Sequence, residues 1–412
     1  MDSYSLVNGV LVTPGHAVSS KTLRVDGNLI VSQGQSAFPV VDLHGDSYIY
    51  PALINVHDHL RGNYLPRVGP SPGRFYLNWL PWDNDLKSSD TYVERSNLSV
   101  DDLYLLSAYK NLFSGVVTVN DHFPHELNDQ LLPTLPIRAI KEYCLAHECS
   151  SFDLKWGEGI EIEHDRALKN NWPFITHLEE GFDAESQDGI GILERLGRLD
   201  DHCVLIHCIG FSDQDIAKVA KSGASVSWCP ASNMFMFNVT CKIKKMLKAG
   251  VNVAIGTDST HTGSVNLLEE VRFARRTYQT LYGEDIPAQT LFEMVTINPA
   301  RAFRMADRIG SLDTGKWADV VLFKRRLDDP YENLAQGTME DIQLLIMAGR
   351  PIYGEIRFLE LLGGKLPADY SLITVAGRSM FVKGNPGALY AEVRRKVAFK
   401  KVLDYLPFEP EV

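Results

Sequence analysis

Residues 48–59 read Tyr48-Ile49-Tyr50-Pro51-Ala52-Leu53-Ile54-Asn55-Val56-His57-Asp58-His59, an apolar run that ends in two histidines separated by one residue. Successive side chains of an extended strand point to opposite faces, so we expect His57 and His59 to point one way and Asp58 the other. Two neutral imidazoles side by side can bind one ion of zinc, iron or another borderline transition metal. This stretch therefore predicts a strand with a metal-binding pair at its end.

Short apolar runs recur after this stretch, each followed by a helical pattern. One helix is expected over 266–283, and another is expected to start with Asn298 as its N-cap and Pro299 in its first turn. Strands that alternate with helices predict parallel β/α units. The further strands are expected, in chain order, at 115–119, 173–176, 203–206, 224–228 and 251–256.

Three of these five strands lead into a polar side chain that can bind a metal. His177 and His207 follow the second and third of them, and Asp258 comes shortly after the fifth. The carboxyl ends of all strands in a β/α barrel converge at one mouth, which brings residues far apart in sequence together. A single strand-end histidine or a turn aspartate is usually structural. It is their conjunction with the pair at 57–59 that predicts a metal site.

Glu180 adds proton-transfer chemistry to this set, because it lies three residues after His177 and just beyond a strand end. A carboxylate close to a metal-bound water can carry protons between water and substrate. The alternative interpretation is a glutamate in the first turn of a helix, where the helix dipole favours a negative charge. Its neighbour Glu179 has no assigned role.

The totals for the chain limit the classes of protein to which it can belong. It has 412 residues, of which 45% are hydrophobic and 23% charged, enough for a barrel with a smaller appended domain. The formal net charge of -11 speaks against binding nucleic acid, which needs a basic surface. Six cysteines without a C-x-x-C pair indicate reduced thiols and a cytoplasmic protein. We see no signal peptide and no run long enough to span a membrane.

The two ends of the chain differ from its middle by their β character. Asn8-Gly9 and Asp26-Gly27-Asn28 are typical of hairpin turns, and strands are expected again at 315–323 and 342–347. We infer that both ends build one β domain beside a central barrel, with a tail that holds a helix around 391–406. The expected divisions are 1–50 and 310–366 for the two parts of a β-sandwich, 51–309 for the barrel and 367–412 for a C-terminal extension.

The segment between Val119 and Pro173 is short for two full β/α units. The third and fourth barrel strands must therefore be compact, and we expect them at 137–140 and 151–154. Lys155 would then lie near the end of the fourth strand.

Further short motifs follow one another along the chain, namely Asp42-Leu43-His44-Gly45, His177-Leu178-Glu179-Glu180, Cys229-Pro230-Ala231-Ser232-Asn233, Gly256-Thr257-Asp258-Ser259, Thr296-Ile297-Asn298-Pro299-Ala300, Gly310-Ser311-Leu312 and Gly315-Lys316-Trp317-Ala318-Asp319. With residues 54–59 and His207, these motifs resemble the amidohydrolase superfamily, in the branch of cytosine and guanine deaminases and triazine chlorohydrolases. The resemblance covers most of the chain. It implies an α/β fold, a (β/α)8 TIM-like barrel with a small β-sandwich domain built from both chain ends.

The resemblance also implies a site with one divalent transition metal per chain, zinc in preference to iron. His207 would lie near the bound water and polarise the substrate, Glu180 would move protons, and Asp258 would accept a proton from the water. Arg61, His122 and His261 are candidates for binding polar or anionic groups of the substrate. The metal ligands would be His57, His59, His177 and Asp258.

The reaction expected from this resemblance is hydrolysis of a non-peptide carbon–nitrogen bond in a small polar cyclic substrate. Deamination of an amino-heterocycle by a metal-activated water is the first expectation. Hydrolysis of a cyclic amide or dechlorination at the same site stays open, as does a binuclear site bridged by a carboxylated Lys155. A catalytically silent scaffold is the non-enzymatic alternative. The expected partner is a small molecule, with neither nucleic acid nor membrane, and a homo-oligomer is compatible with the superfamily.

Overall fold

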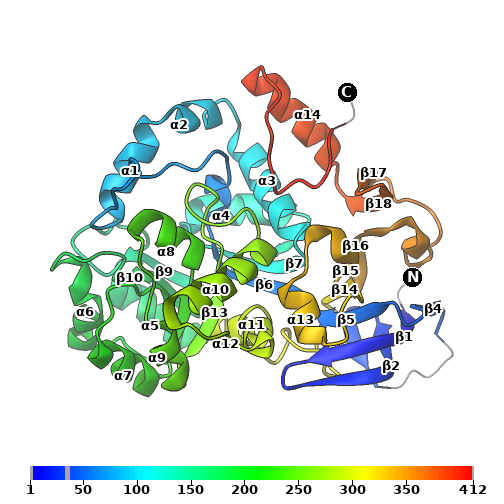
Figure 1. Cartoon of the computed structure of the whole chain (residues 1–412), viewed down its shortest axis with the longest axis horizontal. Coiled ribbons are helices and arrows are strands. Elements are labelled where there is room, and N and C mark those ends of the chain that lie inside the picture. Colours follow the sequence, from blue (N-terminus) through cyan, green and yellow to red (C-terminus); the bar gives the residue numbers. More distant parts are fainter. Residues whose placement is uncertain (1–2, 33–37, 411–412) are drawn as a thin grey trace.

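The computed structural model describes residues 3–32 and 38–410, and parallel strands form the centre of its larger part (Figure 1). A three-stranded sheet has the order β6-β7-β8, and a five-stranded sheet has the order β13-β12-β11-β10-β9. The backbone N–H of Asp258, just after β13, donates to the carbonyl of His57 in β6 over 3.1 Å. The strands are β6 (Leu53–Asp58), β7 (Val116–Asp121), β8 (Arg138–Ala139), β9 (Cys144–Glu148), β10 (Phe174–Leu178), β11 (Cys203–His207), β12 (Ser225–Trp228) and β13 (Asn252–Ile255).

Helices connect these strands and cover the parallel sheets, as the sequence pattern predicted (Figure 1). Capping boxes start two of them, with Ser99 and Asp102 at α3 and Ser212 and Asp215 at α7. The helices are α1 (Trp79–Ser88), α2 (Asp90–Arg95), α3 (Val100–Leu112), α4 (His125–Leu131), α5 (Ile160–Asn170), α6 (Gly189–Leu196), α7 (Asp213–Ser222), α8 (Pro230–Phe237), α9 (Ile243–Lys248), α10 (Leu267–Tyr282), α11 (Ala288–Met294), α12 (Ile297–Ala302) and α13 (Pro330–Ala335).

The helix expected over 266–283 is confirmed as α10. Asn266 caps its start, and Gly283 ends it with a φ of 67°, which favours glycine. The expectation that Asn298 caps the next helix is wrong. Helix α12 starts one residue earlier, at Ile297, and the Asn298 side chain instead donates to the carbonyl of Val253 in β13 over 2.9 Å.

The third and fourth parallel strands are compact, but the fourth does not lie at 151–154 as expected. It is β9, which pairs with β10 and is fully buried. Residues 150–153 form a turn instead, in which the Ser150 hydroxyl accepts from the backbone N–H of Phe152 over 3.0 Å. Serine and aspartate favour such local turns over a strand, which explains the error.

Both ends of the chain contribute to one ten-stranded sheet, with the order β17-β18-β16-β15-β14-β5-β1-β2-β3 and with β4 paired to β1. The antiparallel pair β5–β14 joins the N-terminal strands to the C-terminal ones. The strands are β1 (Ser3–Thr13), β2 (His16–Asp26), β3 (Leu29–Val31), β4 (Val40–Asp42), β5 (Ser47–Pro51), β14 (Val320–Lys324), β15 (Ile342–Met347), β16 (Arg350–Glu355), β17 (Tyr370–Val375) and β18 (Arg378–Lys383).

Two details of this sheet correct the sequence analysis. Asn8-Gly9 is no hairpin turn, because it lies within β1 at a register irregularity and Asn8 takes a φ of 57°. The turn at 26–28 is confirmed, since Asp26 of β2 pairs with Leu29 of β3. The strand expected at 315–323 starts only at Val320, whereas the one at 342–347 is confirmed as β15.

The sheet also continues beyond residue 366, the boundary expected for the C-terminal extension, because β18 pairs with β16. The helix expected around 391–406 is α14 (Pro386–Val397), and Ala398 ends it in a left-handed conformation with a φ of 62°. Helix α14 packs against α3 (Figure 1). The segment after it returns towards the strand end of β6, where the Tyr405 hydroxyl donates to the carbonyl of Asn63 over 3.0 Å.

None of the helices in the described residues is both long and apolar enough to cross a lipid bilayer. The six cysteines are all unpaired and buried.

Candidate metal and active site

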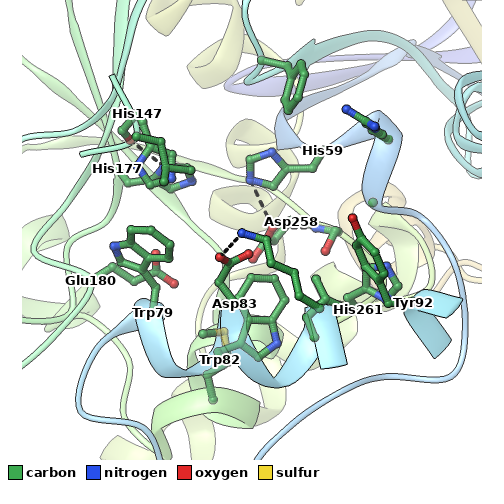
Figure 2. Close-up of a pocket in the computed structure, with 18 of the residues that line it drawn as sticks. His59, Trp79, Trp82, Asp83, Tyr92, His147, His177, Glu180, Asp258 and His261 are labelled. Atoms are coloured by element: carbon green, nitrogen blue, oxygen red, sulfur yellow. Dashed lines mark hydrogen bonds and ion pairs between the residues drawn. The ribbon is translucent and has the colours of Figure 1, made fainter. Parts of the chain in front are cut away.

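Histidines and an aspartate from four parallel strands meet at one centre at the carboxyl ends of these strands (Figure 2). The Nε2 atoms of His57 and His59 lie 3.8 Å and 3.7 Å from Oδ1 of Asp258. The rings of His177 and His207 stack at 5.5 Å, and the ring of His57 lies 5.2 Å from that of His177. The structure thus brings together the five side chains that the sequence predicted to converge.

His57 is the least satisfied side chain of this cluster. It is fully buried, and neither of its ring nitrogens has a hydrogen-bond partner within the described part of the chain. Burial lowers the pKa of His57 well below its usual value, and the neighbouring His59 adds to that shift. A neutral buried imidazole with free nitrogens is costly unless another group binds it, so the site suits a cation.

Hydrogen bonds from outside the cluster fix the orientation of its members. Nδ1 of His177 lies 2.7 Å from the carbonyl of His147, which can only accept, so Nδ1 carries the proton and Nε2 is free to face the centre. Nδ1 of His207 lies 2.8 Å from Oδ1 of Asn233. The hydroxyl of Ser232 donates to Oδ2 of Asp258 over 2.7 Å, which leaves Oδ1 towards the histidines. The donor set is therefore preorganised.

Strained backbone marks the same strand ends. His207 and Asp258 take φ angles of 68° and 53°, in the left-handed region that side chains other than glycine rarely adopt. Such conformations persist where the surrounding structure enforces them, and they gather at functional sites. Here they turn the two side chains from their strands into the common centre.

The surroundings of the two carboxyl groups of the centre shift their pKa values in opposite directions. Burial acts to raise the pKa of Asp258, but His59, His207 and the Ser232 hydroxyl together hold that pKa below its usual value. Burial raises the pKa of Glu180 well above its usual value, and the charge of Asp258 adds to the shift. Asp258 is thus favoured as the anion and Glu180 as the protonated acid. Carboxyl groups with pKa values moved apart are typical of acid–base sites.

Glu180 faces the pocket and Glu179 does not, as the sequence analysis supposed. Oε1 of Glu180 lies 3.6 Å from Nε2 of His207. Oε1 of Glu179 instead accepts from the backbone N–H of Ile190 over 3.2 Å, at the start of α6. Only Glu180 of the two is therefore placed to exchange protons with a ligand.

Asp58 points to the opposite face from the histidines that flank it, and a buried polar network holds it there. Nζ of Lys110 lies 3.1 Å from both carboxylate oxygens, and neither side chain is exposed to solvent. Nδ2 of Asn63 and Nδ2 of Asn111 also donate to it, over 2.8 Å and 2.9 Å. Nζ of Lys110 also donates to the carbonyl of Asp258 over 3.2 Å. The lysine therefore contacts both Asp58, which lies between His57 and His59, and the backbone of Asp258.

A cavity of about 250 Å³ opens from the cluster of histidines and Asp258 to the surface. His59, His177, Glu180, His207 and Asp258 line its inner end. Its walls are mostly aromatic and apolar, formed by Trp79, Trp82, Leu86, Phe123, Leu154, Trp156 and Met236. Flat apolar walls that end in a few polar groups suit a small ring with polar substituents.

The three residues expected to bind substrate differ in their placement. Arg61 and His261 line the cavity. His122 does not, because it is fully buried behind His177, where its Nε2 lies 3.0 Å from the carbonyl of Ala146. The expectation that His122 faces the mouth is therefore wrong. The strand β7 ends one residue before it, and its side chain packs against the neighbouring strands.

Lys155 lies outside the cluster of histidines and Asp258. Its side chain is 80% exposed and pairs with Asp153 at 3.4 Å. The fourth strand ends at Glu148, seven residues before it, so the reason for placing Lys155 at the mouth no longer holds. A binuclear site with this lysine as the bridge is not compatible with the structure.

Sequence reasoning missed several residues that line the cavity. Trp79 and Trp82 of α1 belong to no motif, and Tyr92 and Arg95 lie in the next helix. His147 could have been found, because it is the second-last residue of β9 and a correct position for the fourth strand would have put it at the mouth.

Comparisons with known proteins agree with this geometry. Residues 160–352 match the family model described as the amidohydrolase family. This part of the chain is therefore similar to the amidohydrolase family. Two relatives are named 5-methylthioadenosine/S-adenosylhomocysteine deaminase. The one from Moorella thermoacetica is 31% identical over 183 residues, which are 42% of this chain and 43% of that protein. The one from Caldanaerobacter subterraneus subsp. tengcongensis is 28% identical over 329 residues, 67% of this chain and 73% of that protein.

The chain thus aligns with less than half of the length of the Moorella relative. Among solved structures, an adenosine deaminase from Xanthomonas campestris with bound zinc superimposes with a TM-score of 0.71 at 18% identity. That superposition covers 95% of this chain and 97% of the other. At this identity the likeness concerns the fold, which is a TIM-barrel-type α/β fold.

Proposed function

We propose that this amidohydrolase is a metal-dependent hydrolase that deaminates an amino-substituted heterocycle. The observation that carries the proposal is the convergence of His57, His59, His177, His207 and Asp258 on one centre, with Glu180 beside it. The names of the curated relatives support it, since each is described as a deaminase of an adenine-containing compound.

The donor set fits a divalent transition metal, because three imidazoles and one carboxylate are ligands that zinc accepts. The unpartnered nitrogens of buried His57 are the observation that favours an ion at this point. The zinc in the Xanthomonas structure supports zinc over iron. A metal ion bound here would supply Lewis-acid chemistry that lowers the pKa of a water molecule towards neutrality. The proposed ligands are His57, His59, His177 and Asp258.

The chain's own groups supply the proton transfers. Asp258 is the anion next to the centre and would take a proton from the attacking water. Glu180, whose pKa is raised, lies 3.6 Å from Nε2 of His207 and would donate the proton to the substrate. The water oxygen forms a bond to the ring carbon, a proton moves to the exocyclic nitrogen, and the carbon–nitrogen bond breaks to release ammonia. The products are the oxo-heterocycle and ammonia.

The substrate proposed first is an aminopurine derivative. Trp79, Trp82 and Trp156 form flat walls for a ring system, and the relatives' names point to adenine compounds. Arg61 is proposed to bind a polar part of that substrate, and His261 to act on the substrate through its contact with Arg95.

We also propose the finer architecture. Residues 51–309 would form a closed (β/α)8 barrel, and 1–50 with 310–366 would form a β-sandwich to which β17 and β18 of the 367–412 segment add. The hydrogen bond between Asp258 and His57, which joins the first and last parallel strands, supports closure. Six buried free cysteines favour a reducing, cytoplasmic location.

Ammonia release tests the proposal. Zinc-loaded protein is incubated with a panel of amino-substituted purines, pyrimidines and triazines, next to an Asp258→Asn variant of equal helical content. We expect turnover of at least one aminopurine and none by the variant. A folded, zinc-loaded wild type that releases ammonia from no member of the panel would overturn the proposal.

A further inference from the structure

Two arginine side chains, Arg61 and Arg95, line the cavity without a carboxylate partner. Arg61 lies in the short helical turn after β6, and Arg95 is the last residue of α2. Within the described ranges, neither guanidinium forms an ion pair with an aspartate or glutamate. Arg61 is exposed at the cavity and Arg95 is half-buried. A half-buried arginine next to a second cation carries a charge that an anionic ligand would balance.

The two guanidinium groups lie near enough to affect each other. Burial lowers the pKa of Arg95 below its usual value, Tyr92 opposes that shift, and the charge of Arg61 adds to it. Holding two like charges together without a counter-ion costs free energy, which an anionic ligand between them would recover.

His261 and Tyr92 hold Arg95 in place. Nη1 of Arg95 lies 2.9 Å from Nε2 of His261, and its guanidinium carbon lies 4.6 Å from the centre of the Tyr92 ring. Burial and the charge of Arg95 lower the pKa of His261 to about 3, so this histidine is neutral and its Nε2 accepts from the arginine. Both supports are neutral, so they orient the guanidinium and leave its charge uncompensated.

The other charged side chains of the cavity do not compensate the charges of Arg61 and Arg95. The third cation, Lys87, already pairs with Asp83 at 2.6 Å. The carboxyl groups of Glu180 and Asp258 lie next to the histidines at the inner end of the cavity. Figure 2 shows Tyr92 and His261 across the cavity from Glu180, with His59 and Asp258 between them. The uncompensated positive charge is therefore at the end of the cavity away from the proton-transfer group.

We propose that Arg61 and Arg95 form a subsite for a carboxylate substituent of the substrate, at the end of the cavity opposite Glu180. The inference rests on the proposed function and narrows it, because the substrate becomes an amino-heterocycle that carries an acidic side arm. The planar guanidinium of Arg95 presents paired N–H donors that match the two oxygens of a carboxylate. His261 is a positioning residue for Arg95.

The experiment uses matched substrate pairs that differ in one charge. Adenine, guanine, cytosine and melamine cores are each prepared with a carboxymethyl arm and with a carbamoylmethyl arm of the same shape. Values of kcat/KM are measured from ammonia release by zinc-loaded wild type, Arg95→Gln, Arg95→Lys and Arg61→Gln. Arg357→Gln serves as the matched control, because Arg357 lies in the ten-stranded sheet region and pairs with Glu355.

We expect wild type to prefer the acid over the amide by roughly 10- to 100-fold, the usual effect of charge-assisted hydrogen bonds. Arg95→Gln and Arg61→Gln should each remove most of that preference, mainly through a higher KM for the acids. Arg95→Lys should keep part of the preference for the acid, and Arg357→Gln should keep all of it. Equal kcat/KM for acid and amide in wild type would overturn the subsite while the proposed function stands.

A second readout separates the subsite from the reaction. If no compound releases ammonia, the proposed function fails, and binding of the same pairs is measured by ligand-detected NMR. Tighter binding of the acids, lost in Arg95→Gln, would still support the subsite. Binding that is equal for acids and amides, or unchanged in Arg95→Gln, would refute it.

Discussion

Replacing Lys110 with methionine should destabilise the protein, because it leaves the Asp58 carboxylate buried without a cation. Lys110 and Asp58 are both inaccessible to solvent, and Nζ lies 3.1 Å from each carboxylate oxygen. Removing one partner of a buried pair typically costs about 3–5 kcal/mol. Asn63 and Asn111 continue to donate to Asp58, so we expect a loss near the lower limit, about 3 kcal/mol.

The assay is urea unfolding followed by circular dichroism, with a chelator present so that metal binding does not contribute to stability. The double variant Lys110→Met/Asp58→Asn removes both charges and should regain more than half of the loss. Lys87→Met is the control, since its ion pair with Asp83 is partly exposed and should be worth less than about 1 kcal/mol. The reasoning is refuted if Lys110→Met matches wild type, or if the double variant is no more stable than the single one.

Three further variants test the groups around the centre. Glu180→Gln should keep the metal and lose roughly 100-fold or more in kcat, because it removes the proton donor, and loss of the metal in this variant would contradict the assignment. Burial raises the pKa of Glu179 to about 8, so the folded protein holds a proton that the unfolded chain releases above about pH 4.5. The contribution of Glu179 to stability should therefore fall as pH rises from about 5 to about 8, and Glu179→Gln, measured by urea unfolding at both ends of that window, should lose less stability across it than wild type. Asn233→Ala should lower kcat about tenfold without changing the metal content, because it frees the His207 ring, and an unchanged kcat would show that this hydrogen bond does not matter.

The parallel core and the cluster of histidines with Asp258 could be predicted because they depend on local patterns. The pair at 57–59 ends an apolar strand, and His177, His207 and Asp258 each come at or just beyond the end of another strand. Parallel strands place their carboxyl ends at one edge, so the convergence follows from topology without any knowledge of side-chain packing.

Residues whose role depends on tertiary contacts could not be predicted. Lys110 lies in the last turn of α3, where a lysine is common, and nothing in the sequence indicates that its ammonium group is buried against Asp58. Arg95 ends a short helix, and only the folded chain shows that it lines the same cavity as Arg61. Lys155 was misplaced for a different reason, because local serine and aspartate hydrogen bonds made a turn where the apolar pattern suggested a strand.

Metal stoichiometry tests the central claim most directly. Protein purified after growth with added zinc is analysed by inductively coupled plasma mass spectrometry, together with the variants His57→Ala and Asp258→Ala, each checked for its fold by circular dichroism. We expect about one transition-metal equivalent per chain in wild type and less than about one tenth in the variants. A full equivalent of metal in both variants, or none in folded wild type after reconstitution, would contradict a shared metal centre at these strand ends.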